Sequence, residues 1–391
     1  MKKTILHAAC ALLALLVCLA SFPLAAPKAN AETEIPVGFR RNDYLKIVAF
    51  LEQKDDNGVK NGEKLSDAYD PENPNSWGDS FTWGYDGKES FIEKIRFTWP
   101  GFVGRLDLSG CTGLKLLQCP YDPLTAIDLS GCSALESLSC HSTYTIESLD
   151  LSGCSALTEV VANTNALRYI DLSGCKSLKS LNIGFNELYE LELYSLTSLE
   201  FLSCSVNHLS EFDASCVPSL QTLYCTSNDF ETLDLRPCKA LYTLACRSCP
   251  LRELFLPDRD SLILSELRTE GCGNVGYSNS GGRMVYANAE EGCDFLGWYS
   301  KGGELLSTET DYDFSSFGQT VLFARFTDPR LPGDVNLDGN VTVLDAVLAL
   351  RGAMNIVPLE GIGAVNADFN GDGDVSVLDA VLILRKAMGI I

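Results

Sequence analysis

Leucine recurs through the middle of the chain with a period of 21 residues, with one step of 22. The recurring positions are Leu114, Leu135, Leu157, Leu178, Leu199, Leu220, Leu241 and Leu262. Within each period further apolar residues stand at fixed offsets, as at Leu181, Ile183 and Leu188. A unit this short cannot bury its own apolar face, whereas stacked units bury a continuous leucine column and extend parallel strands. The pattern therefore predicts a solenoid of parallel strands over residues 101–272.

The frame of this repeat is close to L-x-x-L-x-C/I-x-x-N-x-L-x-x-L-D-L-S-G-C. It resembles the leucine-rich repeat, most closely the bacterial internalin type with a cysteine in the strand. The resemblance implies an α/β-type horseshoe with an N-terminal helical cap. The repeated asparagines are expected to satisfy backbone groups in the turn after each strand; they are Asn165, Asn186, Asn207 and Asn228.

The strand positions expected to point outward on the concave side are mostly small and polar. They are Ser137, Ser139, Glu159, Ser180, Asn182, Phe201, Ser203, Thr222, Tyr224 and Arg247. A concave solenoid face usually binds a partner. Only Phe201 and Tyr224 stand out as anchors, so the pattern leaves a protein and a glycan open as ligands.

Ten of the cysteines fall into two columns of the repeat. The strand column holds Cys119, Cys140, Cys204, Cys225 and Cys246, and the SGC column holds Cys111, Cys132, Cys154, Cys175 and Cys238. Ala162, Ile183 and Leu196 replace cysteine in other coils, which indicates a small apolar filler. A buried thiol ladder is therefore favoured over disulfides or a metal site, because the C-x-x-C at Cys246 lacks partner ligands at zinc spacing.

Residues 32–100 are expected to cap the first coil. Tyr44, Ile47, Val48 and Leu51 form one helical stripe, behind Asn42 or Asp43 as the N-cap. Three tryptophans follow in a segment with little other core; they are Trp77, Trp83 and Trp99. Packing in the cap is favoured for them over stacking on sugar rings.

The first residues predict that the chain is exported from the cell. Lys2 and Lys3 precede an apolar run and a small-residue ANA motif, so residues 1–31 are predicted to be a secretory signal peptide. Its removal takes away Lys2, Lys3 and Lys28, and the formal charge of −22 becomes −25. Such acidity argues against nucleic acid or an anionic membrane as partner. No later apolar stretch is long enough for a transmembrane anchor.

After the solenoid, residues 273–327 alternate apolar and polar positions between glycines, which predicts a small β domain. The segment resembles the Listeria–Bacteroides repeat, a β-grasp-like module. The matching positions are Ala287, Ala289, Gly292, Phe295, Gly297, Trp298, Tyr299, Tyr312, Phe314, Leu322, Ala324 and Phe326. Cys293 departs from the tyrosine usual in that family. A spacer role is favoured, with ligand binding by Trp298 as the alternative.

Two acidic stretches, DVNLDGNVTVLDAVLALR and DFNGDGDVSVLDAVLILR, repeat after 34 residues. Both fit a calcium loop, whose oxygens come from positions 1, 3, 5, 7, 9 and 12, with glycine at position 6. The first set is Asp334, Asn336, Asp338, the Asn340 carbonyl, Thr342 through water and Asp345. The second set is Asp368, Asn370, Asp372, the Asp374 carbonyl, Ser376 through water and Asp379. We therefore expect two bound calcium ions.

The segments before these loops, DPRLPG and EGIGAVNA, predict no entering helix, so each loop keeps only its exiting helix. Each loop with its exiting helix is therefore half of an EF-hand. This duplication over residues 333–391 resembles the type I dockerin, an all-α module with paired F-hand loops. The resemblance implies calcium-dependent binding to a cohesin domain of a scaffoldin. The implied contacts are Val343, Leu344, Arg351, Val377, Leu378 and Arg385. Val343, Leu344 and their copies could equally be packed in the module.

The function expected from this multidomain chain is a non-catalytic, secreted interaction protein. It would dock onto a cohesin of a cellulosome-like scaffold at the cell surface and present the solenoid to a protein or glycan. Only His141 and His208 remain after signal removal, so histidine-based hydrolysis has no supported set of residues. The alternatives are a cellulosomal polysaccharide-degrading enzyme, an enzyme inhibitor, or a host-cell adhesin.

Overall fold

The computed structural model describes residues 35–98, 101–194, 196–257, 264–279, 283–290, 293–315, 321–327, 331–336, 338–359 and 361–391. The predicted signal peptide, Trp99, Leu262 and Gly292 lie outside these ranges. Contacts divide the chain into two compact units. One runs to Asp229 and includes Arg236–Leu244, and the other comprises Phe230–Leu235 and Ala245–Ile391.

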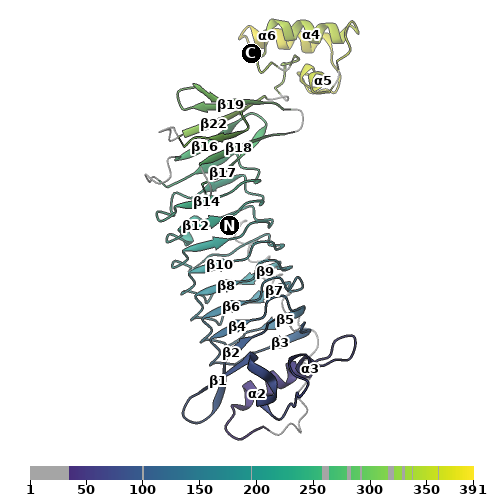
Figure 1. Cartoon of the computed structure of the whole chain (residues 1–391). Helices are drawn as coiled ribbons and strands as arrows, with labels where there is room; N and C mark the ends of the chain where they lie inside the picture. Colours follow the sequence, from purple (N-terminus) through teal and green to yellow (C-terminus); the bar gives the residue numbers. More distant parts are fainter. Residues whose placement is uncertain are drawn as a thin grey trace, which may run out of the picture. The chain divides into compact units, whose positions relative to one another are not determined.

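The first unit is built on one long sheet, in the order β1-β2-β4-β6-β8-β10-β11-β12. Its strands are β1 (Phe81–Tyr85), β2 (Ser90–Arg96), β4 (Leu116–Gln118), β6 (Ser137–Ser139), β8 (Glu159–Val161), β10 (Ser180–Asn182), β11 (Phe201–Ser203) and β12 (Thr222–Tyr224). From β2 onward these strands are parallel and stack coil on coil (Figure 1). Leu181 pairs with Val160 on one side and Leu202 on the other, so the pairing register repeats the sequence period. The predicted leucine-rich solenoid is confirmed.

The asparagine column bonds each coil to the coil before it. Asn186 Nδ2 donates to the carbonyls of Ala162 and Ile183, at 3.1 and 2.9 Å, and its Oδ1 accepts from the Leu167 N–H at 3.0 Å. Asn207 and Asn228 repeat these three contacts one and two coils later. Each buried amide therefore satisfies backbone groups that the turn leaves unpaired, as the sequence predicted.

The return side of the coils carries short strands and turns. These elements are β3 (Gly104–Asp107), β5 (Leu124–Asp128), β7 (Ser148–Asp150), β9 (Tyr169–Asp171) and the 3-10 helix η2 (Ala214–Cys216). The turns need small residues, because a Cβ at Gly174 would lie 1.8 Å from the Ser152 carbonyl oxygen of the preceding coil. The ten ladder cysteines are buried and form no disulfide, as predicted.

The N-terminal cap packs aromatic side chains against helix α2 (Arg41–Leu51). It also contains α3 (Asn61–Leu65) and the 3-10 helix η1 (Pro74–Ser80). Tyr44 and the three aliphatic residues of the predicted stripe are buried. The predicted N-cap is wrong: the N-cap is Arg40, two or three residues before the predicted ones, and buried Asp43 instead accepts the Ile92 N–H at 3.0 Å. Trp77 is fully buried, which agrees with a packing role.

The second unit contains a sheet in the order β13-β15-β16-β22-β19-β20 and the strands β17, β18 and β21. The strands are β13 (Thr232–Asp234), β15 (Glu253–Phe255), β16 (Glu266–Glu270), β17 (Gly273–Ser278), β18 (Met284–Ala289), β19 (Phe295–Ser300), β20 (Leu305–Ser307), β21 (Asp311–Asp313) and β22 (Val321–Phe326). Strand β14 (Thr243–Ala245) ends at Ala245, which pairs with Ser278 of β17. Because β16 pairs with both β15 and β22, the proposed boundary at residue 272 stays a prediction.

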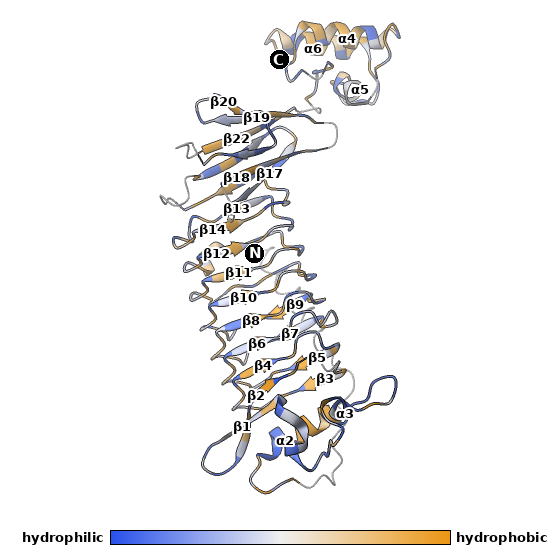
Figure 2. Ribbon diagram, in the orientation of Figure 1, coloured by the Kyte–Doolittle hydropathy of each residue, from blue (hydrophilic) through white to orange (hydrophobic). Residues whose placement is uncertain are grey.

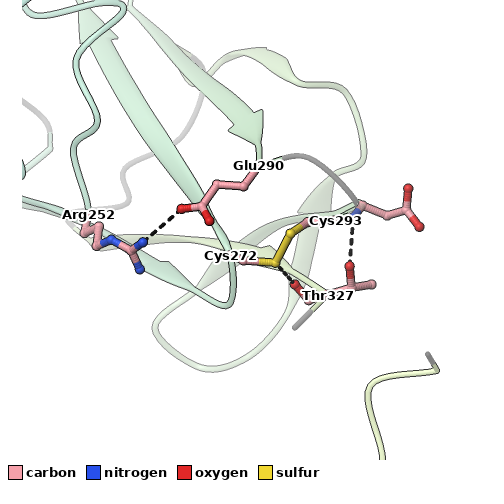
Figure 3. Close-up of a disulfide and its surroundings, with 6 residues drawn as sticks. Arg252, Cys272, Glu290, Cys293 and Thr327 are labelled. Carbon is pink, nitrogen blue, oxygen red and sulfur yellow. Dashed lines mark hydrogen bonds and ion pairs between the residues drawn. A yellow bond between two sulfur atoms is a disulfide. The ribbon is translucent and has the colours of Figure 1, made fainter. Parts of the chain in front are cut away.

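A disulfide joins Cys272 to Cys293 in this unit (Figure 3). The Thr327 hydroxyl accepts the Asp294 N–H at 2.8 Å beside it, and Arg252 pairs with Glu290 at 2.9 Å. The sequence reasoning did not predict this bond. Both cysteines stand outside the two repeat columns, and Cys293 replaces the tyrosine usual in the family. The sequence therefore distinguishes them from the ladder cysteines without indicating that they pair.

The same unit ends in three helices, α4 (Val343–Ala353), α5 (Gly361–Ala367) and α6 (Val377–Ala387). No helix in the described ranges is long and apolar enough to cross a membrane.

Candidate functional site

The first acidic loop is closed by Asp334, which is almost completely buried. Its two carboxylate oxygens accept the N–H groups of Asp338 and Gly339, at 3.1 and 2.9 Å. Gly339 has a φ of 84°, in the left-handed region that favours glycine. The loop therefore turns sharply at position 6, as the calcium-loop pattern requires.

The second loop repeats this geometry. Asp368 accepts the N–H groups of Asp372 and Gly373, at 3.1 and 2.8 Å. Gly373 has a φ of 94°. At position 3 of both loops, the Asn336 and Asn370 oxygens accept the N–H of position 5, at 3.0 and 2.8 Å. At position 5, Asp338 and Asp372 accept the N–H of Asn340 and Asp374, at 2.9 and 3.1 Å.

The last predicted ligand of each loop is also the third residue of its helix. Asp345 accepts the Thr342 N–H and hydroxyl at 2.8 Å, while the Thr342 hydroxyl accepts the Leu344 N–H at 3.2 Å. Asp379 and Ser376 form the same capping box. Reciprocal bonds of this kind satisfy the unpaired donors at a helix start. Asp345 and Asp379 also accept backbone N–H groups near the start of their loops, so each of them joins its loop to the helix that it caps.

The charge balance of the first loop is unfavourable without a cation. Burial raises the pKa of Asp334, and repulsion from Asp345 and Asp338 adds to the rise. Burial also acts to raise the pKa of Asp345, but hydrogen bonds from Asn336 and Thr342 outweigh it and the pKa is lowered. A buried carboxylate among like charges is stabilised by a bound cation.

The donor set fits calcium. Each loop presents carboxylate, amide, carbonyl and hydroxyl oxygens, the hard ligands that Ca²⁺ prefers. Within the described ranges, no three His, Cys, Asp or Glu side chains converge as a metal cluster. The carboxylates of Asp345 and Asp379 face backbone N–H groups instead. The fit therefore rests on the order of the donors and on the buried charge at Asp334.

Helices α4 and α6, which carry many hydrophobic residues (Figure 2), pack on each other around a small core. Its buried members are Val335, Ala346, Ala349, Ala367, Ala380 and Ile383. The repeated alanines Ala346 and Ala380 occupy equivalent positions of the two VLDAVL copies. Each copy thus buries its alanine in this core and leaves the Val-Leu pair that opens the helix exposed.

The implied partner contacts lie on the surface. Val343 and Leu344 are 54% and 55% exposed, and Val377 and Leu378 are 55% and 57% exposed. Arg351 and Arg385 are exposed as well. Both Val-Leu pairs are therefore more than half exposed rather than part of the buried core of the module, and their contact with a partner stays a prediction.

The prediction that no helix enters the second loop is wrong, because α5 ends directly before Asp368. Buried Asn366 on α5 donates to the Asp334 carbonyl at 2.8 Å, and its own carbonyl accepts the Gly333 N–H at 2.8 Å. The short, glycine-containing stretch carries no amphipathic signal. It is held by these tertiary bonds to the first loop.

Except for Arg247, which lies in a turn after β14, the solenoid residues expected to point outward occupy the first and third positions of the strands, on either side of a buried leucine or valine. Phe201 and Tyr224 contact each other edge to face at 5.9 Å. Arg247, in the second unit, lies 4.3 Å over the Tyr286 ring. Trp298 is fully buried and donates to the Glu309 carbonyl at 3.0 Å, so it is not available to stack on a ligand.

Residues 332–387 match the dockerin type I domain. No relative was found among proteins of curated function. The fold is similar to the functional domain of InlJ from Listeria monocytogenes, described as including a cysteine ladder, at 19% identity over 56% of this chain and 72% of that one, with a TM-score of 0.29. A leucine-rich repeat protein of Leptospira interrogans is similar at 17% identity over 41% of this chain and 48% of that one, with a TM-score of 0.29. An internalin, inlF, from Listeria monocytogenes is similar at 18% identity over 42% and 52%, with a TM-score of 0.26.

Proposed function

We propose that this chain is a secreted, non-catalytic interaction protein that docks onto a cohesin of a cellulosome-like scaffold. The dockerin domain docks, and the leucine-rich solenoid presents a separate binding surface to a protein or glycan. Type I dockerin domains bind calcium and act in cohesin docking, so the match to residues 332–387 carries the proposal. The exposed Val-Leu pairs on α4 and α6 support it.

Calcium is proposed to occupy both loops. The ligands would be Asp334, Asn336, Asp338, Asn340, Thr342 and Asp345 in the first loop, and Asp368, Asn370, Asp372, Asp374, Ser376 and Asp379 in the second. The ion would offset the mutual repulsion of the loop carboxylates. Since the same carboxylates cap α4 and α6, calcium binding would be coupled to helix formation.

The contact with cohesin is proposed to involve Val343, Leu344 and Arg351, or their copies Val377, Leu378 and Arg385. Exposed aliphatic pairs beside a cation suit an interface with an apolar centre and a charged rim. Because the two copies have the same structure, either patch could meet one partner surface after a half-turn.

The non-catalytic part of the proposal rests on how the histidines lie. His208 stands between Glu187 and Asp229, at 3.4 and 3.8 Å, and stacks on Tyr189. His141 contacts the hydroxyl of its neighbour Ser142 at 3.3 Å. Neither arrangement resembles a nucleophile activated by an oriented base.

Capture of the chain by immobilised cohesins tests the proposal. The double variant Asp334→Ala, Asp368→Ala is expected to lose capture in calcium. A control with the same charge change, Asp311→Ala with Asp313→Ala, is expected to bind like the unaltered chain. Equal capture of both variants would contradict calcium-dependent docking.

A further inference from the structure

The return side of the solenoid carries a column of carboxylates, one from each coil. Its members are Asp107, Asp128, Asp150, Asp171, Glu192, Asp213 and Asp234. The strand register confirms the alignment, because Asp107 pairs with Asp128 and Asp150 pairs with Asp171. Five of these carboxylates accept the N–H of a serine two residues later; they are Asp107, Asp128, Asp150, Asp171 and Asp213. In most coils the column therefore serves the turn.

The coil of Glu192 departs from this arrangement at two positions. Glutamate replaces aspartate, and Tyr194 stands where those five coils have serine. The turn itself is kept, because the Leu196 N–H still donates to the Leu193 carbonyl at 3.1 Å. Within the described ranges, the Glu192 carboxylate takes part in no hydrogen bond or ion pair. Tyr194 is 64% exposed. The turn thus requires neither side chain.

The two exchanged residues line a pocket together with Tyr169 and Asp171 of the preceding coil. Its volume is about 150 Å³, the space of roughly five water molecules, which suits the end of one side chain. The described lining residues include two carboxylates and two tyrosines and no basic side chain. The pocket therefore favours a small cationic group with a flat surface.

The first coils show which group this column accepts. Arg105 lies 2.8 Å from Asp128 of the following coil, through its guanidinium group. Lys46 of α2 lies 2.6 Å from Asp107. All four of these side chains are less than a quarter exposed. The first two carboxylates of the column are thus paired with cationic side chains of the chain itself.

The pocket repeats this arrangement three coils later without a cation. Asp171 and Glu192 correspond to Asp107 and Asp128, and Tyr169 stands in the column of Arg105. No lysine or arginine in the described part of the chain forms an ion pair with Asp171 or Glu192. A guanidinium group from another molecule would restore the missing ion pair. It would also meet aromatic rings, on which guanidinium groups stack.

We propose that the pocket lined by Tyr169, Asp171, Glu192 and Tyr194 receives an arginine side chain from an exposed segment of a basic protein partner. The formal charge of −22 attracts such a partner. Arginine fits better than lysine, because its planar group bonds carboxylates through two N–H groups and stacks on tyrosine. The inference rests on the proposed function, in which the solenoid is a binding surface, and names the class of partner.

Ligand-observed NMR with the full chain tests the pocket. The probes are three capped tripeptides with glycine on both sides of arginine, lysine or citrulline. Citrulline keeps the length and planar end of arginine but carries no charge. Saturable binding of the arginine peptide is expected, with binding of the other two at least tenfold weaker. Absence of binding by the arginine peptide would overturn the proposal, as would equal binding of the lysine or citrulline peptide.

A matched pair of double variants locates the binding. Glu192→Gln with Tyr194→Ser removes the unpaired carboxylate and restores the serine of the repeat. It is expected to weaken binding of the arginine peptide at least tenfold with unchanged circular dichroism, because both side chains are exposed. Glu89→Gln with Tyr85→Ser makes the same exchanges at exposed residues of the cap and should bind like the unaltered chain. Equal binding by the two double variants would overturn the site.

Cohesin capture by the same samples separates this inference from the proposed docking. Both double variants should be captured like the unaltered chain. A chain that is captured by a cohesin but binds no arginine peptide retains docking and loses the pocket. A chain that binds the arginine peptide but no cohesin retains the pocket and contradicts docking.

Discussion

Asp122 stands where the asparagine column would place an amide. Its Oδ1 accepts the Phe102 N–H at 2.9 Å, as Asn186 accepts the Leu167 N–H. Its Oδ2 is buried without a hydrogen-bond partner among the described residues. An asparagine uses the corresponding Nδ2 to donate to backbone carbonyls, which a carboxylate can imitate only when it is protonated. Asp122 is thus a weak point in the ladder of the first coil.

Protonation of Asp122 should govern stability in mildly acidic conditions. Burial raises the pKa of Asp122 to about 6, while backbone donors from Phe102 and Gly101 and the charge of Lys64 oppose the rise. Because the pKa of Asp122 is higher in the folded than in the unfolded chain, protonated Asp122 contributes to folding stability. This contribution is fully present below the unfolded pKa of 3.8 and is lost as pH rises through about 6.

Asp122→Asn is therefore expected to stabilise the chain at pH 7.5 by about 1–3 kcal/mol, the range for a buried polar group left unsatisfied. At pH 4 the two chains should have nearly the same stability. Thermal unfolding at both pH values measures the difference. Equal stability at pH 7.5 would show that the free oxygen has a partner in solution.

The ladder cysteines do more than fill space. Cys132 and Cys175 donate their S–H groups to the carbonyls of Leu108 and Leu151, at 3.2 and 3.3 Å. Burial raises the pKa of Cys132 and Cys175 to about 12. A thiol that is buried and protonated is inert to alkylation and exchange.

Native alkylation should accordingly spare both columns. Cys216 is the one free cysteine of the described residues that is not buried, so iodoacetamide followed by mass mapping should modify it first. Cys272 and Cys293 should be recovered as a disulfide. Rapid labelling of Cys132 or Cys140 in the folded chain would contradict a closed ladder.

At the scale of elements, regular periods were readable from the sequence and tertiary bonds were not. The leucine period predicted the strands, and the duplicated loops predicted that α4 and α6 follow them. Helix α5 was missed because the bonds of Asn366 to the first loop hold it rather than an apolar stripe. The Cys272–Cys293 bond was missed because each cysteine is isolated in the sequence.

Helices α4 and α6 should need calcium. Without the ion, the repulsion around Asp334 is uncompensated, and the capping carboxylates belong to the same loops. Chelation of calcium from the full chain should reduce the helical circular dichroism signal while the β signal persists. Adding calcium back should restore the helical signal. A helical signal unchanged by chelation would contradict coupling between the loops and the helices.

The Val-Leu patches should matter for binding and little for folding. Because Leu344 and Leu378 are more than half exposed, replacing either by Ala should change the unfolding free energy by less than about 0.5 kcal/mol. Each single variant should still bind cohesin through the other patch, whereas the double variant should bind at least tenfold more weakly in calorimetry. A single replacement that abolishes binding would mean that one patch alone is used.

At the scale of the whole molecule, the proposed function assigns attachment and recognition to different parts of the chain. The dockerin domain carries the acidic loops and the exposed aliphatic pairs, and the solenoid carries the stacked parallel strands. The sequence identified both regions because each is a repeat.

The most direct test of the account is calorimetric titration of the full chain with a panel of cohesins, first in calcium and then in chelator. We predict tight binding to at least one cohesin in calcium and its loss in chelator. Absence of binding to every cohesin, with calcium content confirmed by metal analysis, would contradict docking. Binding unchanged by chelator would contradict the role given to the two loops.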